Sequence, residues 1–286
     1  DEINKPRDGR TLTAPSGDDI VLGDNGVVIF STPGVLSSIE TTYPASAGAD
    51  WIDAGGGADV VIGGAGADIL FAGDDVVQDI IIGDEARLDF NVTGGLISAM
   101  SIAPTFGGND VIETGGGDNI VIAGSGDDEI NKPRVGRTLT APSGDDIVLG
   151  DNGVVIFSTP GVLKSIETTY PASAGNDWID AGGGADVVIG GAGADTLFAG
   201  DDVLQDIIIG DEARLDYDAN GKLILAFSIV PASGGNDVIE GLGGDNIIIG
   251  GAGADMITTG DGADVILGDN GAFDFAVTGK LLRVRS

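Results

Sequence analysis

The sequence predicts an all-β protein, a right-handed parallel β-roll or β-helix solenoid with inserted β-hairpins. Aspartates recur at a nonapeptide spacing behind glycine-rich stretches, as at Asp50, Asp59 and Asp68. Each of these aspartates precedes a short run of β-favouring residues, such as Ile69–Phe71. The whole pattern then returns further along the chain. A turn, a carboxylate and a short strand that recur at fixed spacing are typical of a solenoid.

The long repeat indicates how the chain is organised. The stretch Asp1–Arg7 returns as Asp128–Arg134, and residues 1–89 differ from residues 128–216 at only five positions. We therefore expect β-roll units at 1–127 and 128–254, with the start of a third unit, ending in a hairpin, at 255–286. Two half-units are expected within the first repeat, near 19–78 and 79–145. Because the chain begins in mid-pattern without methionine, we expect it to be a piece of a longer protein.

Each half-unit contains an insertion that predicts a β-hairpin. The step from Asp19 to Asp50 is one nonapeptide plus a long insertion. Within it, Val27–Phe30 and Val35–Thr42 favour strands on either side of a Pro-Gly turn. Later versions turn at Thr93–Gly95 and at Asn220–Gly221. A separate insertion, as long as one nonapeptide, falls within 131–143 and predicts a surface loop.

Two nonapeptides make one coil of the predicted roll, and successive coils pair as parallel strands ~4.8 Å apart. The second residue after each aspartate then points into the roll. All of these residues in the first repeat are aliphatic, which supports the register: Val21, Ile52, Val61, Leu70, Ile81, Ile112, Val121 and Ile130.

One face of the roll is predicted to be apolar on its outside as well. Its strands read IVL at 20–22, VVI at 60–62 and III at 80–82, and later coils repeat this. Such a surface exceeds what a soluble monomer leaves exposed. We expect the hairpins to fold back over it, because they begin at the ends of these strands. The competing hypothesis is that this face joins copies of the chain.

Composition restricts the chemistry. The chain has 46 acidic and 13 basic residues, a formal charge of −33, yet 42% of its residues are hydrophobic. Such a chain folds once cations neutralise its charge, whereas the charge opposes a nucleic-acid partner. No apolar stretch is long enough for membrane insertion. Cysteine and histidine are absent, which excludes disulfides and thiolate or imidazole metal sites and leaves oxygen ligands suited to Ca²⁺.

The sequence GGAGAD at 63–68, 190–195 and 250–255, each time followed by a strand, resembles the RTX nonapeptide repeat of secreted bacterial proteins. The resemblance implies a β-roll that binds several Ca²⁺ ions between successive turns, through the sixth-position aspartate and turn carbonyls. The implied ligands are Asp50, Asp59, Asp68, Asp110, Asp128, Asp177, Asp186, Asp195, Asp237, Asp255 and Asp264. We add Asp19 and Asp146 as further candidates.

Some positions depart from the motif. Asn119 and Asn246 replace the aspartate, which weakens calcium binding there. The turns before Asp79 and Asp206 lack the glycines, so we do not include these two aspartates among the ligands. A further set of aspartates begins the hairpins, and the sequence leaves open whether they are ligands or turn formers: Asp24, Asp84, Asp151, Asp211 and Asp269.

The expected function is structural. We expect an extracellular or cell-surface segment of a secreted RTX protein, such as an adhesin stalk, a surface-layer component or a filament subunit, that folds on Ca²⁺ binding after type I secretion. One alternative is a calcium-dependent folding module of a secreted enzyme or toxin. Another is a glycan-binding adhesin domain that uses the 131–143 loop or the hairpins. An enzyme is not expected, since no nucleophile–base arrangement is visible. For Trp51 and Trp178 we expect packing against a hairpin, and the alternative is that they form a binding stripe.

Overall fold

The computed structural model describes residues 1–5, 16–46, 48–134 and 142–286. In these ranges the chain forms three β-sheets and two short 3-10 helices, η1 (Pro44–Ser46) and η2 (Pro171–Ser173). Part of the predicted surface loop at 131–143 lies outside the described residues. Neither described helix has the length and apolar character needed to span a membrane.

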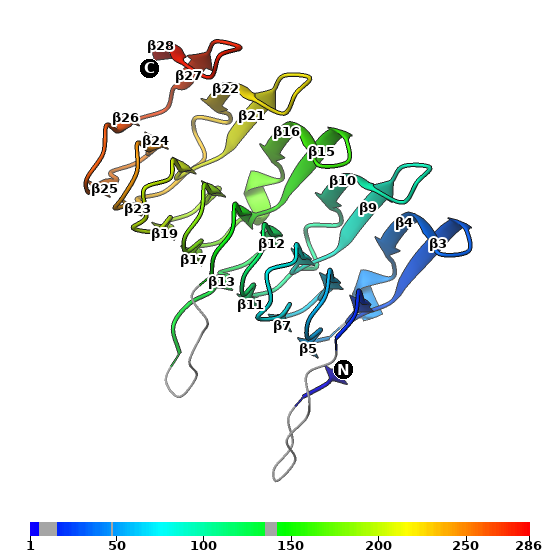
Figure 1. Cartoon of the computed structure of the whole chain (residues 1–286). Helices are drawn as coiled ribbons and strands as arrows, with labels where there is room; N and C mark the ends of the chain where they lie inside the picture. Colours follow the sequence, from blue (N-terminus) through cyan, green and yellow to red (C-terminus); the bar gives the residue numbers. More distant parts are fainter. Residues whose placement is uncertain (6–15, 47, 135–141) are drawn as a thin grey trace.

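Two of the three sheets are parallel and together form the coils of a roll (Figure 1). The first roll sheet contains β1 (Glu2–Ile3), β5 (Trp51–Asp53), β7 (Ile69–Phe71), β11 (Val111–Glu113), β13 (Glu129–Ile130), β17 (Trp178–Asp180), β19 (Thr196–Phe198), β23 (Val238–Gly241) and β25 (Met256–Thr259). The second roll sheet contains β2 (Ile20–Leu22), β6 (Val60–Ile62), β8 (Ile80–Ile82), β12 (Ile120–Gly124), β14 (Ile147–Asp151), β18 (Val187–Ile189), β20 (Ile207–Ile209), β24 (Ile247–Ile249) and β26 (Val265–Leu267). The predicted all-β roll is confirmed.

The strands pair in the predicted register. Ile52 lies beside Leu70 and Leu70 beside Ile112, so the second residue after each repeat aspartate is aligned from coil to coil. The inward residues predicted in the first repeat fill the space between the two roll sheets and are fully buried, except that Val21 in the first described coil is only partly buried. The roll interior is therefore a single column of aliphatic side chains, as the alternation predicts.

The hairpins form the third sheet, which we call the hairpin sheet. Its strands are β3 (Gly26–Thr32), β4 (Val35–Thr41), β9 (Ala86–Phe90), β10 (Leu96–Ser101), β15 (Gly153–Thr159), β16 (Val162–Thr168), β21 (Ala213–Tyr217), β22 (Leu223–Ser228), β27 (Ala272–Phe275) and β28 (Leu281–Arg285). Neighbouring hairpins pair with each other, because β4 pairs with β9 and β10 with β15. This continuity was not predicted from the sequence.

The hairpin sheet covers the apolar face of the roll. Leu88, Ala99 and Val155 on its inner side are fully buried against the second roll sheet, where Ile82 and Ile122 are also fully buried. Figure 1 shows the hairpins in one row along one side of the roll. The hypothesis that hairpins cover this face is confirmed. The alternative, in which the same face stays open to join copies of the chain, is wrong because its side chains are already buried.

The expected packing of the tryptophans against a hairpin is wrong. Trp51 and Trp178 lie on β5 and β17 of the first roll sheet, whereas the hairpins pack on the second. Each tryptophan instead contacts a phenylalanine on the next strand, with ring centroids 5.0 Å apart: Phe71 for the first and Phe198 for the second. The side chains point away from the hairpins because they occupy outward positions of a strand on the opposite face.

We predict that Ile81→Ala lowers the free energy of unfolding by about 2–5 kcal/mol, because it leaves a cavity in the roll interior. The matched control is Val76→Ala, whose side chain is 84% exposed and whose loss changes stability by about 0.5 kcal/mol or less. Urea unfolding in calcium measures both. An effect of Ile81→Ala as small as that of the control would contradict the packing described above.

Candidate metal centre

Aspartates along one edge of the roll form a continuous row, which we call the first ladder. The backbone N–H of Asp50 donates to Oδ1 of Asp68 at 2.6 Å, and the N–H of Asp68 donates to Oδ1 of Asp110 at 2.7 Å. The same bond repeats from coil to coil along the edge. The first ladder contains Asp50, Asp68, Asp110, Asp128, Asp177, Asp195, Asp237 and Asp255.

The opposite edge carries a second ladder with the same bond. The N–H of Asp19 donates to Oδ1 of Asp59, and the N–H of Asp146 donates to Oδ1 of Asp186, both at 2.8 Å. The second ladder contains Asp19, Asp59, Asp79, Asn119, Asp146, Asp186, Asp206, Asn246 and Asp264. The structure thus places all thirteen predicted ligands in two rows. It also adds Asp79 and Asp206 to the second row.

The second carboxylate oxygen of most ladder aspartates has no partner. Within the described residues, this Oδ2 is buried and lacks a hydrogen-bond donor in Asp50, Asp59, Asp68, Asp110, Asp128, Asp146, Asp177, Asp186, Asp195, Asp237 and Asp255. These are eleven of the thirteen predicted ligands. Burying an ionised oxygen without a partner is costly, so each of these oxygens requires a proton or a cation.

Main-chain carbonyl oxygens lie beside these carboxylates in the first ladder. A Cβ built on Gly63 would lie 2.4 Å from Asp68 Oδ2 and 2.4 Å from the carbonyl oxygen of Gly83, so the two oxygens are at most twice that distance apart. Only glycine leaves this space open. The same pairing of carboxylate and carbonyl oxygens occurs at Gly23, Gly83, Gly150, Gly190, Gly210 and Gly250.

This donor set fits Ca²⁺, which accepts carboxylate and carbonyl oxygens in loose geometry. No group of three or more acidic side chains in the described residues is arranged to hold a metal ion by itself. A bound ion therefore has to take main-chain carbonyls together with the ladder carboxylates. One turn differs, because Ala123 stands where the equivalent turns have glycine, and its methyl group occupies the space that is open elsewhere.

The aspartates at the hairpin bases act as hydrogen-bond acceptors. Asp84 accepts the backbone N–H of Gly108 at 3.1 Å and that of Ser125 at 2.5 Å. Its carboxylate thereby joins the two ends of a hairpin to the next turn of the roll. Asp151 and Asp211 each accept two equivalent bonds, and Asp24 accepts one from Ala65. The sequence left open whether these aspartates are calcium ligands or turn formers. The structure shows these four as acceptors of turn hydrogen bonds.

The turns that lack glycine hold aspartates with a role that the sequence analysis missed. Asp75 accepts the N–H of Gly57 in the preceding coil and the N–H of Val77 in its own turn, both at 2.7 Å. Asp202 does the same at the equivalent position of the second unit, with Gly184 and Leu204. The Asp-Asp-Val sequence, which is repeated in both units, was the feature of the sequence that could have indicated this role.

Burial raises the pKa values of the ladder carboxyl groups. Burial, together with a smaller contribution from neighbouring carboxylates, raises the pKa of Asp68 to about 8 and that of Asp195 to about 9. Burial also raises the pKa of Asp177 and of Asp186 to about 8. The folded chain without cations therefore retains protons on these groups near neutral pH.

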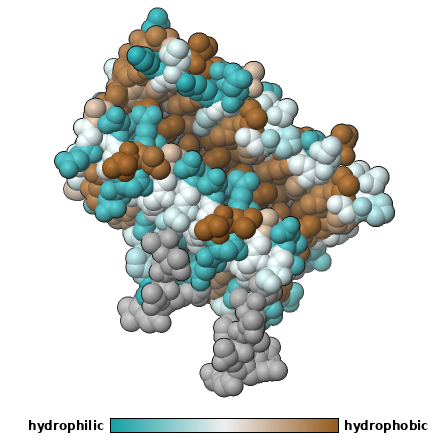
Figure 2. All heavy atoms as spheres, viewed as in Figure 1, coloured by the Kyte–Doolittle hydropathy of each residue, from teal (hydrophilic) through white to brown (hydrophobic). Residues whose placement is uncertain are grey.

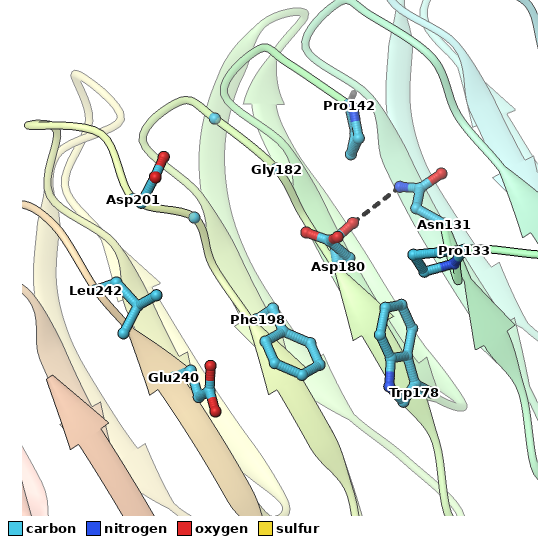
Figure 3. Close-up of a pocket in the computed structure, with 12 residues that line it drawn as sticks. Asn131, Pro133, Pro142, Trp178, Asp180, Gly182, Phe198, Asp201, Glu240 and Leu242 are labelled. Carbon is cyan, nitrogen blue, oxygen red and sulfur yellow. Dashed lines mark hydrogen bonds between the residues drawn. The ribbon is translucent and has the colours of Figure 1, made fainter. Parts of the chain in front are cut away.

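A groove of 660 Å³ lies on the outer side of the first roll sheet (Figure 3). The rings of Trp178 and Phe198 form its floor on neighbouring strands, and Asn131 Nδ2 donates to the carbonyl oxygen of Asp180 at 2.9 Å. Figure 2 shows apolar patches between hydrophilic residues on this side of the molecule. The described lining also includes Pro133, Pro142, Gly182, Gly183, Gly200, Asp201, Glu240 and Leu242.

We predict that the calcium-free fold loses stability as pH rises from about 5 to 8. The buried aspartates have pKa values raised above the unfolded value of 3.8, so the folded state binds more protons over this range. The stabilisation that these protonated aspartates give to the fold is complete below pH 3.8. It is lost as the pH passes their folded-state pKa values of about 7 to 9. Circular dichroism of calcium-free protein measures this: urea midpoints apply at the acidic end, where the protonated fold persists, and the β-type spectrum is expected to be lost as the pH approaches neutrality.

The control for this experiment is the same series in millimolar calcium, where the trend reverses because a cation competes with protons for the carboxylates. A calcium-free midpoint that rises with pH would show that the ladder carboxylates are solvated rather than buried.

A comparison with protein-family models supports the same interpretation of the turns. The model of the RTX calcium-binding nonapeptide repeat matches four copies, at residues 45–76, 105–131, 172–204 and 232–266. Searches of curated proteins and of solved structures gave no match. The matched segments contain turns and strands of the roll and leave out the hairpin strands. The chain therefore carries four copies of the RTX calcium-binding nonapeptide repeat.

Proposed function

We propose that this chain is a calcium-stabilised structural segment of a secreted protein, such as an adhesin stalk, a surface-layer component or a filament subunit. The observation that carries the proposal is the set of eleven buried Oδ2 atoms without a hydrogen-bond donor, arranged in two rows. A structure that aligns partnerless carboxylates from coil to coil needs positive charge between the coils. The repeats supply the expectation that this charge is Ca²⁺.

The thirteen predicted aspartates would hold the ions together with turn carbonyls, and Ca²⁺ would neutralise their charge. In the first ladder, Asp68 and Asp195 each face a carbonyl oxygen of the next coil. Asp19 and Asp264 lie at the two ends of the second ladder, where each has a neighbouring coil on one side only. The sites at Asn119 and Asn246 would bind more weakly, because an amide carries no charge.

Folding coupled to binding follows from the same charges. A chain with a formal charge of −33 repels itself at low calcium. When calcium fills the sites, its binding free energy adds to the free energy of folding. Export of the unfolded chain followed by folding in extracellular calcium is consistent with this coupling and with the type I secretion that the RTX resemblance implies.

The near-identity of the two units supports a rod that gains length by duplication. The hairpin sheet runs across both units without interruption, so it reinforces the roll along its axis. We keep the proposed division into units 1–127, 128–254 and 255–286. The alternative, a folding module attached to a secreted enzyme or toxin, uses the same calcium chemistry. The sequence next to this segment in the parent protein distinguishes the two.

We predict that removing calcium at neutral pH abolishes the β-type circular dichroism of the chain and that adding calcium restores it. The variant Asp195→Asn should raise the calcium concentration at the folding midpoint by about tenfold. The reason is that a charged calcium ligand is lost while the ladder hydrogen bond remains. The ladder itself tolerates asparagine, as Asn119 and Asn246 show. The matched control is Asp218→Asn, in an exposed hairpin turn, which should leave the midpoint unchanged. A spectrum that is the same in chelator and in calcium would exclude the proposal.

Glycan binding is a second candidate function, and the groove favours it. Aromatic rings present a flat apolar surface beside polar groups, an arrangement that suits the two kinds of surface of a sugar ring. Trp178 and Phe198 supply the rings, and Asp180, Asp201 and Glu240 line the same groove. The carboxylates favour a neutral sugar over an anionic one. Trp51 and Phe71 repeat the ring pair in the first unit.

For this candidate we predict that the double variant Trp51→Ala/Trp178→Ala binds neutral glycans about tenfold more weakly than the parent chain, since each ring platform is lost. A glycan array in calcium, followed by titration of any glycan that binds, measures the change. Phe30→Ala is the control, because its ring is 50% exposed on the hairpin sheet and lies away from the groove. Absence of binding by the parent chain would remove this candidate.

A further inference from the structure

We propose a second type of cation site, at the base of two hairpins, centred on Glu85 and Glu212. The inference rests on the proposed calcium function and extends it to residues outside the nonapeptide repeat. Both glutamates directly follow the aspartate that begins a hairpin, and they occupy the same place in the two units. The cation they suit is a hard divalent ion that prefers oxygen ligands, which in this chain means Ca²⁺.

Both glutamates are buried without the partners that a carboxylate needs. Glu85 is 1% exposed, and Glu212 is 0% exposed. The hydroxyl of Thr41 donates to Oε2 of Glu85 at 3.2 Å, but Oε1 has no donor. Neither carboxylate oxygen of Glu212 has a donor within 3.5 Å, although the hydroxyl of Thr168 lies close enough to lower the pKa that burial raises. Since surface carboxylates are solvated at little cost, burial at this position requires compensation by a cation or a proton.

The surroundings of Glu85 favour a cation. Asp24 and Asp68 are its acidic neighbours: burial is the main cause that raises the pKa values of Glu85 and Asp68, and the charge of Asp24 on Glu85 and of Glu85 on Asp68 adds to it. The pKa of Asp84 is raised by Glu85 in the same way. In the part of the chain that the structure describes, no lysine or arginine forms an ion pair with Glu85.

Glu212 repeats this environment in the second unit. Asp151 and Asp211 begin two successive hairpins, and burial raises their pKa values, with a smaller contribution from the charge of Glu212. None of the ion pairs among the described residues includes Glu212. Oδ2 of Asp195, which is the ladder residue equivalent to Asp68 in the second unit, is also buried and without a donor. Partnerless acidic oxygens therefore gather at the hairpin base in both units.

The other hairpins show what this position holds when no charge is present. Asparagine replaces glutamate at Asn25, Asn152 and Asn270. Asn152 is fully buried like Glu212, and its Oδ1 also lacks a donor, yet its Nδ2 donates to Oγ of Ser125 at 2.7 Å. An amide thus finds a partner in this place by donating a hydrogen bond, which an ionised carboxylate is unable to do. The glutamates therefore differ from Asn25, Asn152 and Asn270 in having no side-chain N–H group to donate, so their negative charge requires a compensating positive charge.

Such a site would connect the hairpin sheet to the roll. Thr41 lies at the end of β4, and its Oγ1 accepts the N–H of Ala86 at the start of β9 at 3.0 Å. Glu85 therefore lies where two hairpins meet, near the ladder residue Asp68. An ion bound by Glu85, with main-chain carbonyls to complete its coordination, would fasten both hairpins to the calcium ladder.

The test is the calcium stoichiometry of the double variant Glu85→Gln/Glu212→Gln, measured by equilibrium dialysis against saturating calcium. We expect two fewer ions per chain than in the parent, and a smaller rise in the thermal midpoint on adding calcium. The control Glu40→Gln removes a half-exposed glutamate that pairs with Arg87 on the hairpin surface, and it should keep the full number of ions. The variant Glu85→Asn/Glu212→Asn introduces the amide that other hairpins carry and replaces the first variant if that one fails to fold.

The outcomes separate this inference from the proposed function. If the parent chain binds calcium and both double variants keep every ion, the glutamates are protonated structural residues and the inference is wrong. If the parent chain binds no calcium, the proposed function itself fails. Loss of two ions with the ladder sites still filled supports a distinct hairpin-base site.

Discussion

The structure depends on one interaction, the bond between the backbone N–H of a repeat aspartate and Oδ1 of the aspartate in the next coil. This bond aligns the coils, as between Asp177 and Asp195 at 2.8 Å. In eleven of the ladder aspartates it also places Oδ2 in a buried position without a donor. The same contact that organises the backbone thus accumulates negative charge between the coils. The stability of the roll and the need of its buried carboxylates for a proton or a cation therefore have a single origin.

The hairpins resolve a second constraint. A roll whose second sheet is apolar on both sides, as at Ile80–Ile82, needs a cover, and each hairpin alone is too narrow to provide it. Pairing between hairpins, as between β10 and β15, produces a sheet as long as the roll itself. The aspartates at the hairpin bases join this cover to the turns, so Asp84 couples the outer sheet to the ladder edge. Order in the ladder and order in the hairpin sheet are expected to rise together.

Much of the fold and of the candidate site was predictable because both depend on short, local patterns. The nonapeptide spacing placed Ile52 and Val61 inside the roll and put all thirteen candidate aspartates in two rows. Hairpin covering of the apolar face was also predictable from where the hairpins begin. The tryptophans were assigned wrongly, because the sequence does not state which outer face a hairpin folds over. The bonds of Asp75 and Asp202 were missed, since they depend on how an irregular turn meets the coil before it.

By itself, the sequence determined the repeat, the alternation and the chemistry of the ligands, because a residue's spacing from the nearest aspartate sets the direction of its side chain. Only the tertiary structure decided which groups lack partners. Burial and hydrogen bonding are properties of what packs nearby, and residues far away in the sequence supply those contacts, as Thr41 does for Glu85. For this reason Glu85 and Glu212, which look like ordinary surface glutamates in the sequence, emerge as buried carboxylates only when the hairpins lie against the roll.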